Sequence, residues 1–333
     1  MKKATAIVNA NIALIKYWGK RDKKLVLPNN SSISMTFDKL NTVTTVEFDE
    51  KYNEDILILD NQEFKEGEVF ERAVGHLNLI REISGIGEKA KIVSKNNFPT
   101  AAGLASSASG FAALSLAGSK AAGKDLDLKE LSILARRSGS GSATRSCLGG
   151  FVEWLRGEKE DGSDSCAVQI APAEHWPEFR MIVTIVSIIK KKVSSTAGMD
   201  QTVKTCPMYK AWLDTANEDI KRVKKGILEK DFTLVGSTAE FNCLKMHATM
   251  MTTKPALIYW MPTTLEIIQA VLAWREEGLE SYFTIDAGPQ VKVICLENQV
   301  PELEKRLKNI EGVKKIIVCK PGEGPGLIDD HLF

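Results

Sequence analysis

Two short segments rich in serine, glycine and alanine have the composition of anion-binding loops. The first, PTAAGLASSASG at residues 99–110, lies between a predicted strand and a predicted helix. At such a junction, free backbone N–H groups and the helix dipole both favour a phosphate. The segment is neither a Walker A loop, which needs Gly-Lys-Ser/Thr, nor a GxGxxG turn. Taken alone, its composition fits close packing of backbones at least as well as phosphate binding.

The second segment, RRSGSGSATRS at residues 136–146, adds arginine to serine and glycine. The planar guanidinium group suits carboxylates and phosphates. Two such segments in one half of the chain therefore indicate a polyanionic ligand. Arg136 and Arg137 have an alternative interpretation as the solvated end of a helix. Arg145 lies among small hydroxyl residues, so it is the preferred ligand-facing arginine.

Three further groups could contribute to the same site. KYWGK at residues 16–20 brings two lysines and a tyrosine to a strand end, and KKKVSST at 190–196 joins lysines to hydroxyls. YFTIDAGP at 282–289 places Asp286 at the end of an apolar strand. Each has a plainer explanation: a surface rim, a solvated charge run and a carboxylate that caps a turn. Beside a cationic pocket, Asp286 would instead act as a base or a charge partner.

Composition limits the classes of protein to consider. The chain has 333 residues, 44% hydrophobic and 26% charged, as in an ordinary globular protein. The formal net charge of +1 favours neither nucleic acid nor an anionic membrane as a partner. Six scattered cysteines without a CxxC pair fit a reducing cytosol better than a metal or redox site. With no signal peptide and no apolar run of about 18 residues, we expect a soluble cytoplasmic protein.

The elements that must position these groups fall into two halves. Alternating β-branched segments predict strands, and apolar residues at helical spacing predict helices. The predicted strands are 5–18, 42–48, 55–60, 89–99, 180–188, 281–288, 290–296 and 314–320. The predicted helices are 66–85, 109–123, one that begins near 127, 208–231, 263–278 and 300–310. We expect an α+β protein whose two lobes comprise residues 1–180 and 181–333.

Seven motifs, in this order along nearly the whole chain, resemble the mevalonate diphosphate decarboxylase family of the GHMP kinase superfamily. They are NIALIKYWGKRD, LPNNSSIS, FPTAAGLASSASG, RRSGSGSATRS, VSSTAGM, MHATMMTTKP and YFTIDAGP. The third alone would indicate only the superfamily, whereas KYWGKRD with SGSGSATRS and DAGP is far more specific. The resemblance implies a two-lobe GHMP kinase fold with a deep cleft, binding of ATP and Mg²⁺, and a homodimer. The implied reaction phosphorylates the C3 hydroxyl of mevalonate 5-diphosphate, and phosphate and CO₂ then leave to give isopentenyl diphosphate.

The resemblance also implies roles for particular residues. Asp286 would lie beside the C3 hydroxyl, Arg145 would hold the substrate carboxylate, and Lys20 would be the third catalytic group. The residues expected to bind substrate are Tyr17, Lys20, Ser140, Ser142, Arg145, Ser195 and Thr196. Those expected to bind ATP are Ser94, Gly103, Leu104, Ala105, Ser106, Ser107 and Lys191 or a neighbour in the lysine run at 190–192, with Ser106 also on the metal.

Two departures from the family pattern bear on the substrate. Gln290 stands where the family usually has asparagine after DAGP, and Thr196 and Ala197 stand where many bacterial members have Arg-Asp. The second departure removes an arginine from the expected diphosphate end. A phosphomevalonate decarboxylase, or a kinase that stops at the 3-phosphate, therefore stays an alternative on the same fold. A catalytically inactive binding protein of that fold is another, against which the intact site residues argue.

Overall fold

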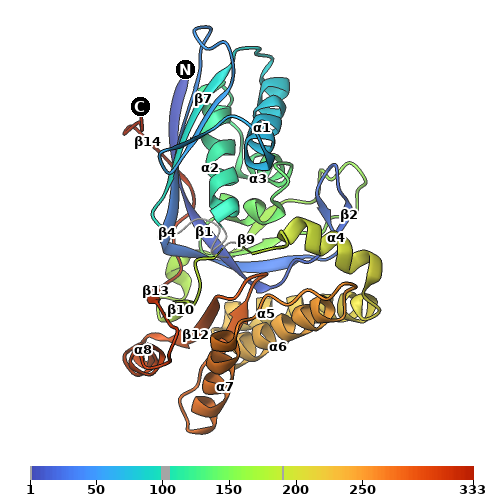
Figure 1. Cartoon of the computed structure of the whole chain (residues 1–333), viewed down its shortest axis with the longest axis vertical. Coiled ribbons are helices and arrows are strands. Elements are labelled where there is room, and N and C mark those ends of the chain that lie inside the picture. The colour runs from blue at the N-terminus through green and yellow to red at the C-terminus, as the bar shows by residue number, and fades with distance from the viewer. Residues whose placement is uncertain (1, 99–105, 190) are drawn as a thin grey trace.

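The computed structural model describes residues 2–98, 106–189 and 191–333. Its first lobe is built on an eight-stranded sheet whose main path runs β14-β1-β4-β7-β5-β6, with β8 and β9 extending from β4 (Figure 1). The strands are β1 (Lys3–Ile15), β4 (Ser32–Phe48), β5 (Ile56–Leu59), β6 (Gln62–Phe64), β7 (Ala90–Asn96), β8 (Phe151–Trp154), β9 (Ala167–Ala171) and β14 (Gly326–Ile328). A short hairpin, β2 (Lys20–Asp22) and β3 (Leu27–Pro28), follows β1.

Helices α1 (Glu68–Ser84), α2 (Ser106–Ala121) and α3 (Leu128–Arg136) lie on one side of this sheet (Figure 1). The small residues of α2 let it pack closely: a Cβ on Gly118 would come within 2.6 Å of Ile80 Cδ1. α3 begins at a capping box between Asp127 and Glu130. The 3₁₀ helix η1 (Gly141–Cys147) then leads into β8.

The second lobe is a four-stranded antiparallel sheet, in the order β11-β12-β10-β13, with helices packed around it. Its strands are β10 (Phe179–Ile185), β11 (Tyr282–Ile285), β12 (Val291–Leu296) and β13 (Lys315–Cys319). Its α-helices are α4 (Ser195–Thr205), α5 (Tyr209–Glu229), α6 (Phe232–Met251), α7 (Pro262–Glu276) and α8 (Val300–Lys308). The short 3₁₀ helices η2 (Ala173–His175) and η3 (Glu297–Gln299) precede β10 and α8.

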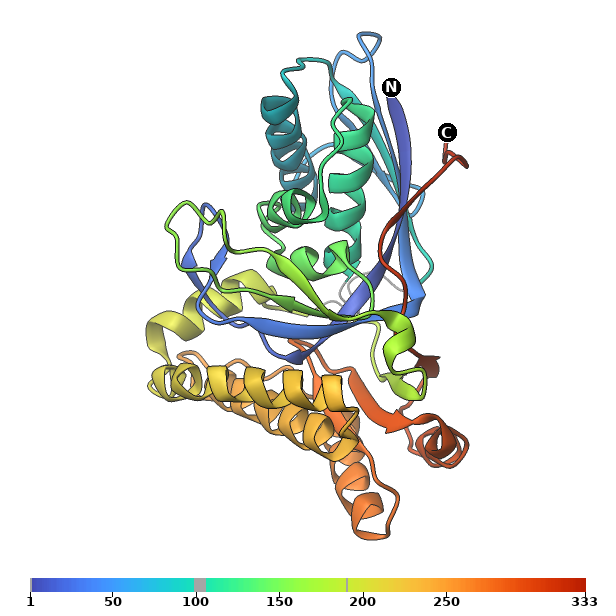
Figure 2. The same cartoon turned by 180° about the vertical axis from the view of Figure 1, so that it is seen from behind.

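The two lobes share a hydrophobic core. Ile12 and Phe151 from the first sheet join Met181, Val223 and Tyr282 from the second lobe in one buried cluster. The paired helices α5 and α6 run beneath the first sheet, as the view from behind shows (Figure 2), and α6 contacts both β1 and β11. This contact brings the ends of two strands from different lobes close together.

The structure confirms the α+β class, and the predicted strands and helices are present with shifted ends. Sequence patterns missed α4 and α6 and the strands β2, β3, β6, β8, β9 and β14. α6 was missed because polar residues such as Thr238, Asn242 and His247 are buried along it, so its apolar periodicity is weak. The division at residues 180 and 181 stays a prediction, and β14 returns to pair with β1 in the first sheet. Across the described ranges, no helix is long and apolar enough to cross a bilayer.

Candidate active site

A cavity of about 790 Å³ lies between the two lobes. Most of the predicted site residues that the structure describes line it: Tyr17, Ser94, Ser106, Ser107, Ser140, Ser142, Arg145, Lys191, Ser195, Thr196 and Asp286. Gly103, Leu104 and Ala105 lie outside the described residues. Lys20 lies on β2, outside this lining, so its assignment to the site stays a prediction.

The two serine-rich segments meet at this cavity. Ser106 and Ser107 begin α2, and the Ser140 hydroxyl donates a hydrogen bond of 3.1 Å to Ser107 Oγ. Ser140 and Ser142 also lie within hydrogen-bonding distance, at 3.4 Å. The N-terminus of α2 and the loop before η1 therefore present hydroxyl groups to one region of the cavity. Such an arrangement suits a phosphate group.

Asp286 follows β11 directly and forms an ion pair across the lobes. Lys16, the residue after β1, donates from Nζ to Asp286 Oδ1 at 2.6 Å and to the Ala13 carbonyl at 2.9 Å. The Lys16 side chain is only 1% exposed, whereas the Asp286 side chain is 28% exposed toward the cavity. The lysine is thus the buried member of the pair, and the carboxylate faces the open space.

Further cations surround the Asp286 carboxylate. Burial would raise its pKa, but Lys16, Lys292 and Arg145 together lower it to about 2. Lys292 lies on β12 opposite Thr284 and is itself 1% exposed. Burial lowers the pKa of Lys292 to about 8 against the opposing attraction of Asp286. The carboxylate is therefore ionised at neutral pH in a region with an excess of positive charge.

Arg145 is held rigidly in the cavity wall by η1. Its Nε donates to Asn11 Oδ1 at 3.2 Å, and its Nη1 donates to Ser32 Oγ at 2.5 Å. Burial lowers the pKa of Arg145 to about 10, against opposing effects of Asp286 and Tyr17, so the group stays charged at neutral pH. A guanidinium fixed in this way can bind an anionic group in one orientation.

Tyr17 contributes a buried hydroxyl to the same wall. Its ring packs edge-on against Trp154 with centroids 4.7 Å apart. Within the described part of the chain, the hydroxyl has no hydrogen-bond partner. Burial raises the pKa of this hydroxyl, and Arg145 opposes the rise. An unpaired buried hydroxyl that lines a cavity is suited to bind a polar group of a ligand.

The start of α4 closes the second lobe's side of the cavity. Ser194 caps the helix by accepting the Ala197 N–H at 3.2 Å, which leaves Ser195 and Thr196 in the first turn. Lys191 Nζ donates to Ser195 Oγ at 2.6 Å and to the Ala287 carbonyl at 2.8 Å. Burial lowers the pKa of Lys191 to about 8, with Asp286 opposing. These contacts place a cation and two hydroxyls at a helix N-terminus.

The opposite end of the cavity is more apolar. Leu57, Leu59, Phe111 and Leu114 line it together with Ser94, whose hydroxyl lies 2.8 Å from Thr44 Oγ1. The cavity therefore has one end rich in cations and hydroxyls and another suited to a flat, apolar group. A nucleotide has both kinds of surface.

Sequence reasoning missed three cations of the site. Lys16 was noted in the KYWGK motif without a role, and Lys292 lies in an apolar strand where nothing singled it out. Arg72 lines the cavity from α1, and no motif in the sequence singled it out. A Cβ on Gly139 would lie 3.5 Å from its Nε, so this arginine lies against the second serine-rich segment.

Two other residues, Arg136 and Gln290, have surroundings that the sequence did not predict. Arg136 is fully buried rather than a solvated helix end: it donates to the carbonyls of Leu25, Gly162 and Ser165. Gln290 is also buried; its Oε1 accepts the Val186 N–H at 2.7 Å and its Nε2 donates to the Ser187 carbonyl. The longer side chain thus ties the turn after Asp286 to the end of β10.

Fold and site together define a protein of the GHMP kinase superfamily, since solved structures with this two-lobe fold superpose on nearly the whole chain. Two family models match it: the diphosphomevalonate decarboxylase-like N-terminal domain at residues 8–167, and the mevalonate 5-diphosphate decarboxylase C-terminal domain at residues 181–311. The chain belongs to the diphosphomevalonate decarboxylase family.

Individual relatives match over nearly their whole length. Diphosphomevalonate decarboxylase of Candida albicans is 38% identical, with 100% of this chain and 99% of the relative covered. The crystal structure of mevalonate diphosphate decarboxylase from Staphylococcus aureus is 38% identical and superposes with a TM-score of 0.92, covering 98% of each chain. A structure of MDDEF in complex with MVAPP, AMPPCP and magnesium is 40% identical, with a TM-score of 0.91 and coverage of 98% and 99%.

Proposed function

We propose that this chain catalyses the ATP-dependent decarboxylation of mevalonate 5-diphosphate to isopentenyl diphosphate, with release of ADP, phosphate and CO₂. The observation that carries the assignment is the ionised Asp286 carboxylate, which faces a cavity between the lobes and is surrounded by cations. A relative 40% identical in sequence was solved with MVAPP, AMPPCP and magnesium, which agrees with a cavity that has both a cationic and an apolar end.

In the proposed reaction, Asp286 aligns the C3 hydroxyl of the substrate. The carboxylate accepts a hydrogen bond from the hydroxyl and directs its oxygen toward the γ-phosphoryl group of ATP. Because the pKa of Asp286 is about 2, the carboxylate is a weak base. Its contribution is therefore mainly alignment and, once phosphate leaves, stabilisation of positive character at C3.

Arg145 holds the substrate carboxylate in the proposed complex. Asn11 and Ser32 fix the guanidinium, so the carboxylate binds in one orientation. In that orientation the bond between the carboxylate and the substrate's methylene group can line up with the orbital that empties at C3. Loss of CO₂ then supplies the electron pair of the new double bond.

ATP is proposed to place its phosphates at the start of α2 and its adenine at the apolar end near Ser94. Among the described residues, no group of three His, Cys, Asp or Glu could enclose a metal ion. Mg²⁺ commonly keeps several waters and binds substrate phosphates with few protein oxygens. The Ser106 hydroxyl at the cavity wall fits such a nucleotide-borne ion. When bound, the ion neutralises negative charge on the phosphates.

A diphosphate, rather than a monophosphate, is the proposed distal group of the substrate. Arg72 lines the cavity, and Lys20 lies near it: burial lowers the pKa of Lys20, Asp200 opposes this, and the charge of Arg72 lowers it further. Together with Lys192 in the lining, these cations offset the arginine that many bacterial members of the family carry where this chain has Thr196 and Ala197.

One assay tests the proposal and its alternatives. The protein is incubated with ATP and either mevalonate 5-diphosphate or mevalonate 5-phosphate, and ADP, CO₂ and the alkene product are followed together. We expect all three products in equal amounts, with the diphosphate preferred. ADP without CO₂ would indicate a 3-kinase, preference for the monophosphate would indicate a phosphomevalonate decarboxylase, and no turnover would leave a binding protein.

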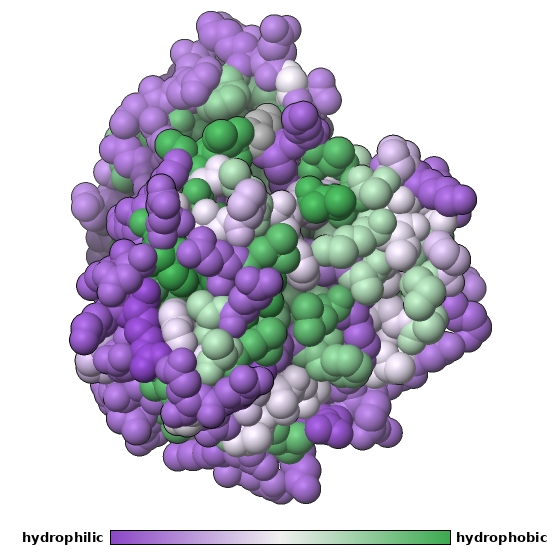
Figure 3. All heavy atoms as spheres, turned by 60° about the horizontal axis from the view of Figure 1, so that its bottom comes forward, coloured by the Kyte–Doolittle hydropathy of each residue, from purple (hydrophilic) through white to green (hydrophobic). Residues whose placement is uncertain are grey.

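We also propose that the protein is a homodimer. Figure 3 looks onto the end formed by the second lobe's helices and shows hydrophobic side chains gathered in the middle of that face. Phe241 on α6 is 60% exposed and Ile258 after it is 68% exposed, with Leu265 on α7 also exposed. Exposed apolar side chains gathered on one face commonly mark an interface. Light scattering should give twice the chain mass for the protein and a monomer for Phe241→Glu; a monomeric wild type would contradict the proposal.

The proposed compartment is the cytoplasm. All six cysteines are buried free thiols, which persist in a reducing environment. Fractionation of cells that express a tagged chain should recover it with cytosolic markers, and recovery with a secreted or membrane fraction would contradict this.

A further inference from the structure

Helix α6 holds the backbone of Lys16 from behind the active site. The Lys16 N–H donates to Asn242 Oδ1 at 2.8 Å, and both residues are almost completely buried. Lys16 follows the last residue of β1, so its N–H is beyond the registered pairs of the β1–β4 ladder. A buried backbone N–H without a partner costs about as much as a lost hydrogen bond. Asn242 therefore fixes the point at which the chain leaves the first sheet toward the site.

The same helix holds the strand that carries Asp286. Cys243 Sγ accepts the Ile285 N–H at 3.1 Å, and His247 Nε2 lies 3.2 Å from the Ile285 carbonyl oxygen. Asp286 is the next residue in the chain. One helix thus contacts the backbone at both members of the Lys16–Asp286 pair, although they come from different lobes.

The amide of Asn242 is oriented by an ion pair on its outer side. Asn242 Nδ2 donates to Asp219 Oδ2 at 2.7 Å, and Lys245 Nζ donates to the same oxygen at 2.5 Å. Lys245 also donates to Thr215 Oγ1 at 2.9 Å. Because the Asp219 carboxylate attracts the NH₂ end, the carbonyl end of the amide must face Lys16.

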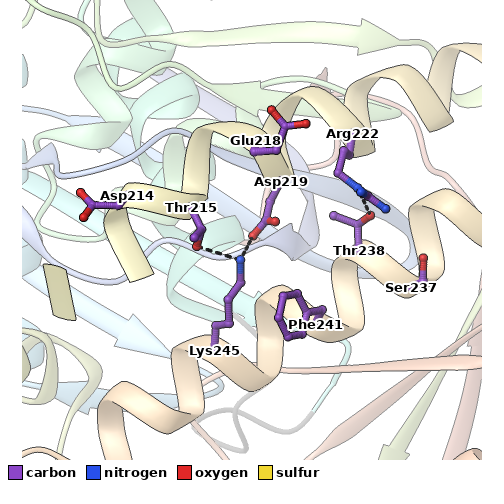
Figure 4. A pocket seen from close by; sticks show the side chains of 9 residues that line it. All are labelled: Asp214, Thr215, Glu218, Asp219, Arg222, Ser237, Thr238, Phe241 and Lys245. Carbon is purple, nitrogen blue, oxygen red and sulfur yellow. Dashed lines mark hydrogen bonds and ion pairs between the residues drawn. The ribbon is translucent and has the colours of Figure 1, made fainter. Parts of the chain in front are cut away.

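This ion pair lies at a second cavity, of about 510 Å³, between α5 and α6. Figure 4 shows the Lys245 ammonium pointing from α6 toward Asp219 and Thr215 on α5. A continuous set of hydrogen bonds therefore leads from this outer cavity through Asp219 and Asn242 to Lys16. From Lys16 Nζ it reaches the Asp286 carboxylate.

We propose that Asn242, oriented by Asp219, is a positioning residue that fixes Lys16 and thereby Asp286 for the reaction. The inference rests on the proposed function, since it assigns Asp286 the alignment of the C3 hydroxyl. Asn242 does not line the active-site cavity and acts through Lys16 alone. Misplacement of a reacting group by about 1 Å can reduce the rate about 100-fold, even when its cause is distant.

Asn242→Leu is the first test, because leucine has a similar size and removes both hydrogen bonds. We expect kcat per folded enzyme to fall about 30- to 100-fold. Michaelis constants for both substrates should stay within about threefold, because the groups that bind them are unchanged. This separation of kcat from KM is the signature of a positioning role.

An exchange of amide and carboxylate provides the rescue. Asn242→Asp alone places a second carboxylate beside Asp219, and the two repel each other. We expect a loss of kcat similar to that of Asn242→Leu. Adding Asp219→Asn restores the pattern at residue 242: the new amide donates to the carboxylate at 242, which accepts the Lys16 N–H. Lys245 keeps the Thr215 hydroxyl as an acceptor. The double variant should recover kcat to within about fivefold of wild type. If the double variant has no higher kcat than Asn242→Asp, the inference is overturned. This result decides the question even if Asn242→Leu fails to fold.

Ser132→Ala is the matched control. Ser132 is fully buried in α3, and its hydroxyl accepts the Ala167 N–H at 3.0 Å, away from both cavities. It should lower the melting temperature as other buried hydrogen-bond losses do, with kcat unchanged. If it lowers kcat as much as Asn242→Leu at an equal loss of melting temperature, the effect is only structural and the inference fails. If wild type itself releases no CO₂, the proposed function fails instead, and the two failures are distinct.

Discussion

Two lysine–aspartate pairs line two different cavities in the described part of the chain, and they are arranged in opposite ways. In the cavity between the lobes, Lys16 is 1% exposed and Asp286 is 28% exposed. In the cavity between α5 and α6, Asp219 is 8% exposed and Lys245 is 16% exposed. The separations are nearly equal, 2.6 and 2.5 Å. The two pairs therefore differ in which residue faces the cavity, and not in the distance between their charged atoms.

The groups that surround the two aspartates differ as well. Asp219 accepts hydrogen bonds from Lys245 and Asn242, so its carboxylate is engaged in holding the fold. Asp286 adjoins Lys16, Lys292, Lys191 and Arg145, and its carboxylate faces a cavity lined by hydroxyls. An excess of cations around an accessible carboxylate suits a polyanionic ligand that brings the missing negative charge. The Lys245–Asp219 pair joins one cation to one carboxylate, so it needs no negative charge from a ligand.

Asp286→Asn should have the largest effect, because it removes the charge of the aspartate that faces the cavity between the lobes. Asparagine is nearly isosteric, so the fold and the binding of ATP should survive. The negative charge that aligns the C3 hydroxyl and stabilises positive character at C3 is lost. We expect kcat to fall at least ~10³-fold, with little change in KM.

Steady-state assays of CO₂ release and direct binding of both substrates check this outcome. Asp219→Asn is the matched control, since it removes the charge of the other aspartate. Its kcat should fall by no more than about tenfold, because an amide at 219 can still accept from Asn242. Turnover of Asp286→Asn within about tenfold of wild type would remove Asp286 from the mechanism.

Arg145→Lys should have the next largest effect. Lysine keeps the positive charge but loses the fork that Asn11 and Ser32 hold. We expect kcat/KM for the decarboxylation substrate to fall about 100-fold while ATP binding stays within about threefold. Unchanged kinetics in a folded variant would place the substrate carboxylate elsewhere.

Much of the cavity wall could be predicted from local sequence. Asp286 follows an apolar strand in DAGP, and the serines after residues 99 and 136 have the composition of anion-binding loops. These signals are local because a strand end or a helix start is itself a local feature. Most of the predicted residues within the described ranges accordingly line one cavity.

The pairings across the lobes could not be predicted in this way. Lys16 and Asp286 are 270 positions apart, and nothing in either segment specifies the other. Asn242 lies in a helix whose buried polar residues conceal its periodicity. Arg136 looked solvated because the carbonyls that it binds come from two distant turns. Tertiary contacts decide these roles, and sequence spacing does not contain them.

The pH dependence of the reaction should report the lysine charges around Asp286. Burial lowers the pKa of Lys191 and of Lys292 to about 8, with Asp286 opposing in both. A rise in pH through about 8 removes these charges from the free enzyme, so attraction for the anionic substrates weakens. We expect kcat/KM to fall by up to about tenfold per pH unit above this pH.

Lys191→Arg separates the two lysines, because arginine stays protonated throughout this range. The fall in kcat/KM should become shallower, and what remains belongs to Lys292. Measurements from about pH 6 to 9.5 cover the transition. A profile that is flat for wild type would show that neither lysine titrates there, and an unchanged profile for Lys191→Arg would assign the whole fall to other groups.

Lys245→Met should have the smallest effect of all, and it tests the other half of the comparison. Lys245 is the outermost member of the hydrogen-bonded set, and its loss leaves Asp219 with the donor of Asn242. The amide of Asn242 therefore keeps its orientation, and Lys16 keeps its acceptor. We expect kcat per folded enzyme to change by no more than about threefold. The melting temperature should fall clearly, because the largely buried Asp219 carboxylate loses its cation. Lys16→Met, which removes the corresponding lysine of the other pair, should lower kcat at least about tenfold more than Lys245→Met does. Equal losses from the two substitutions would mean that both pairs act only through stability, and the difference in which member faces the cavity would then have no functional meaning.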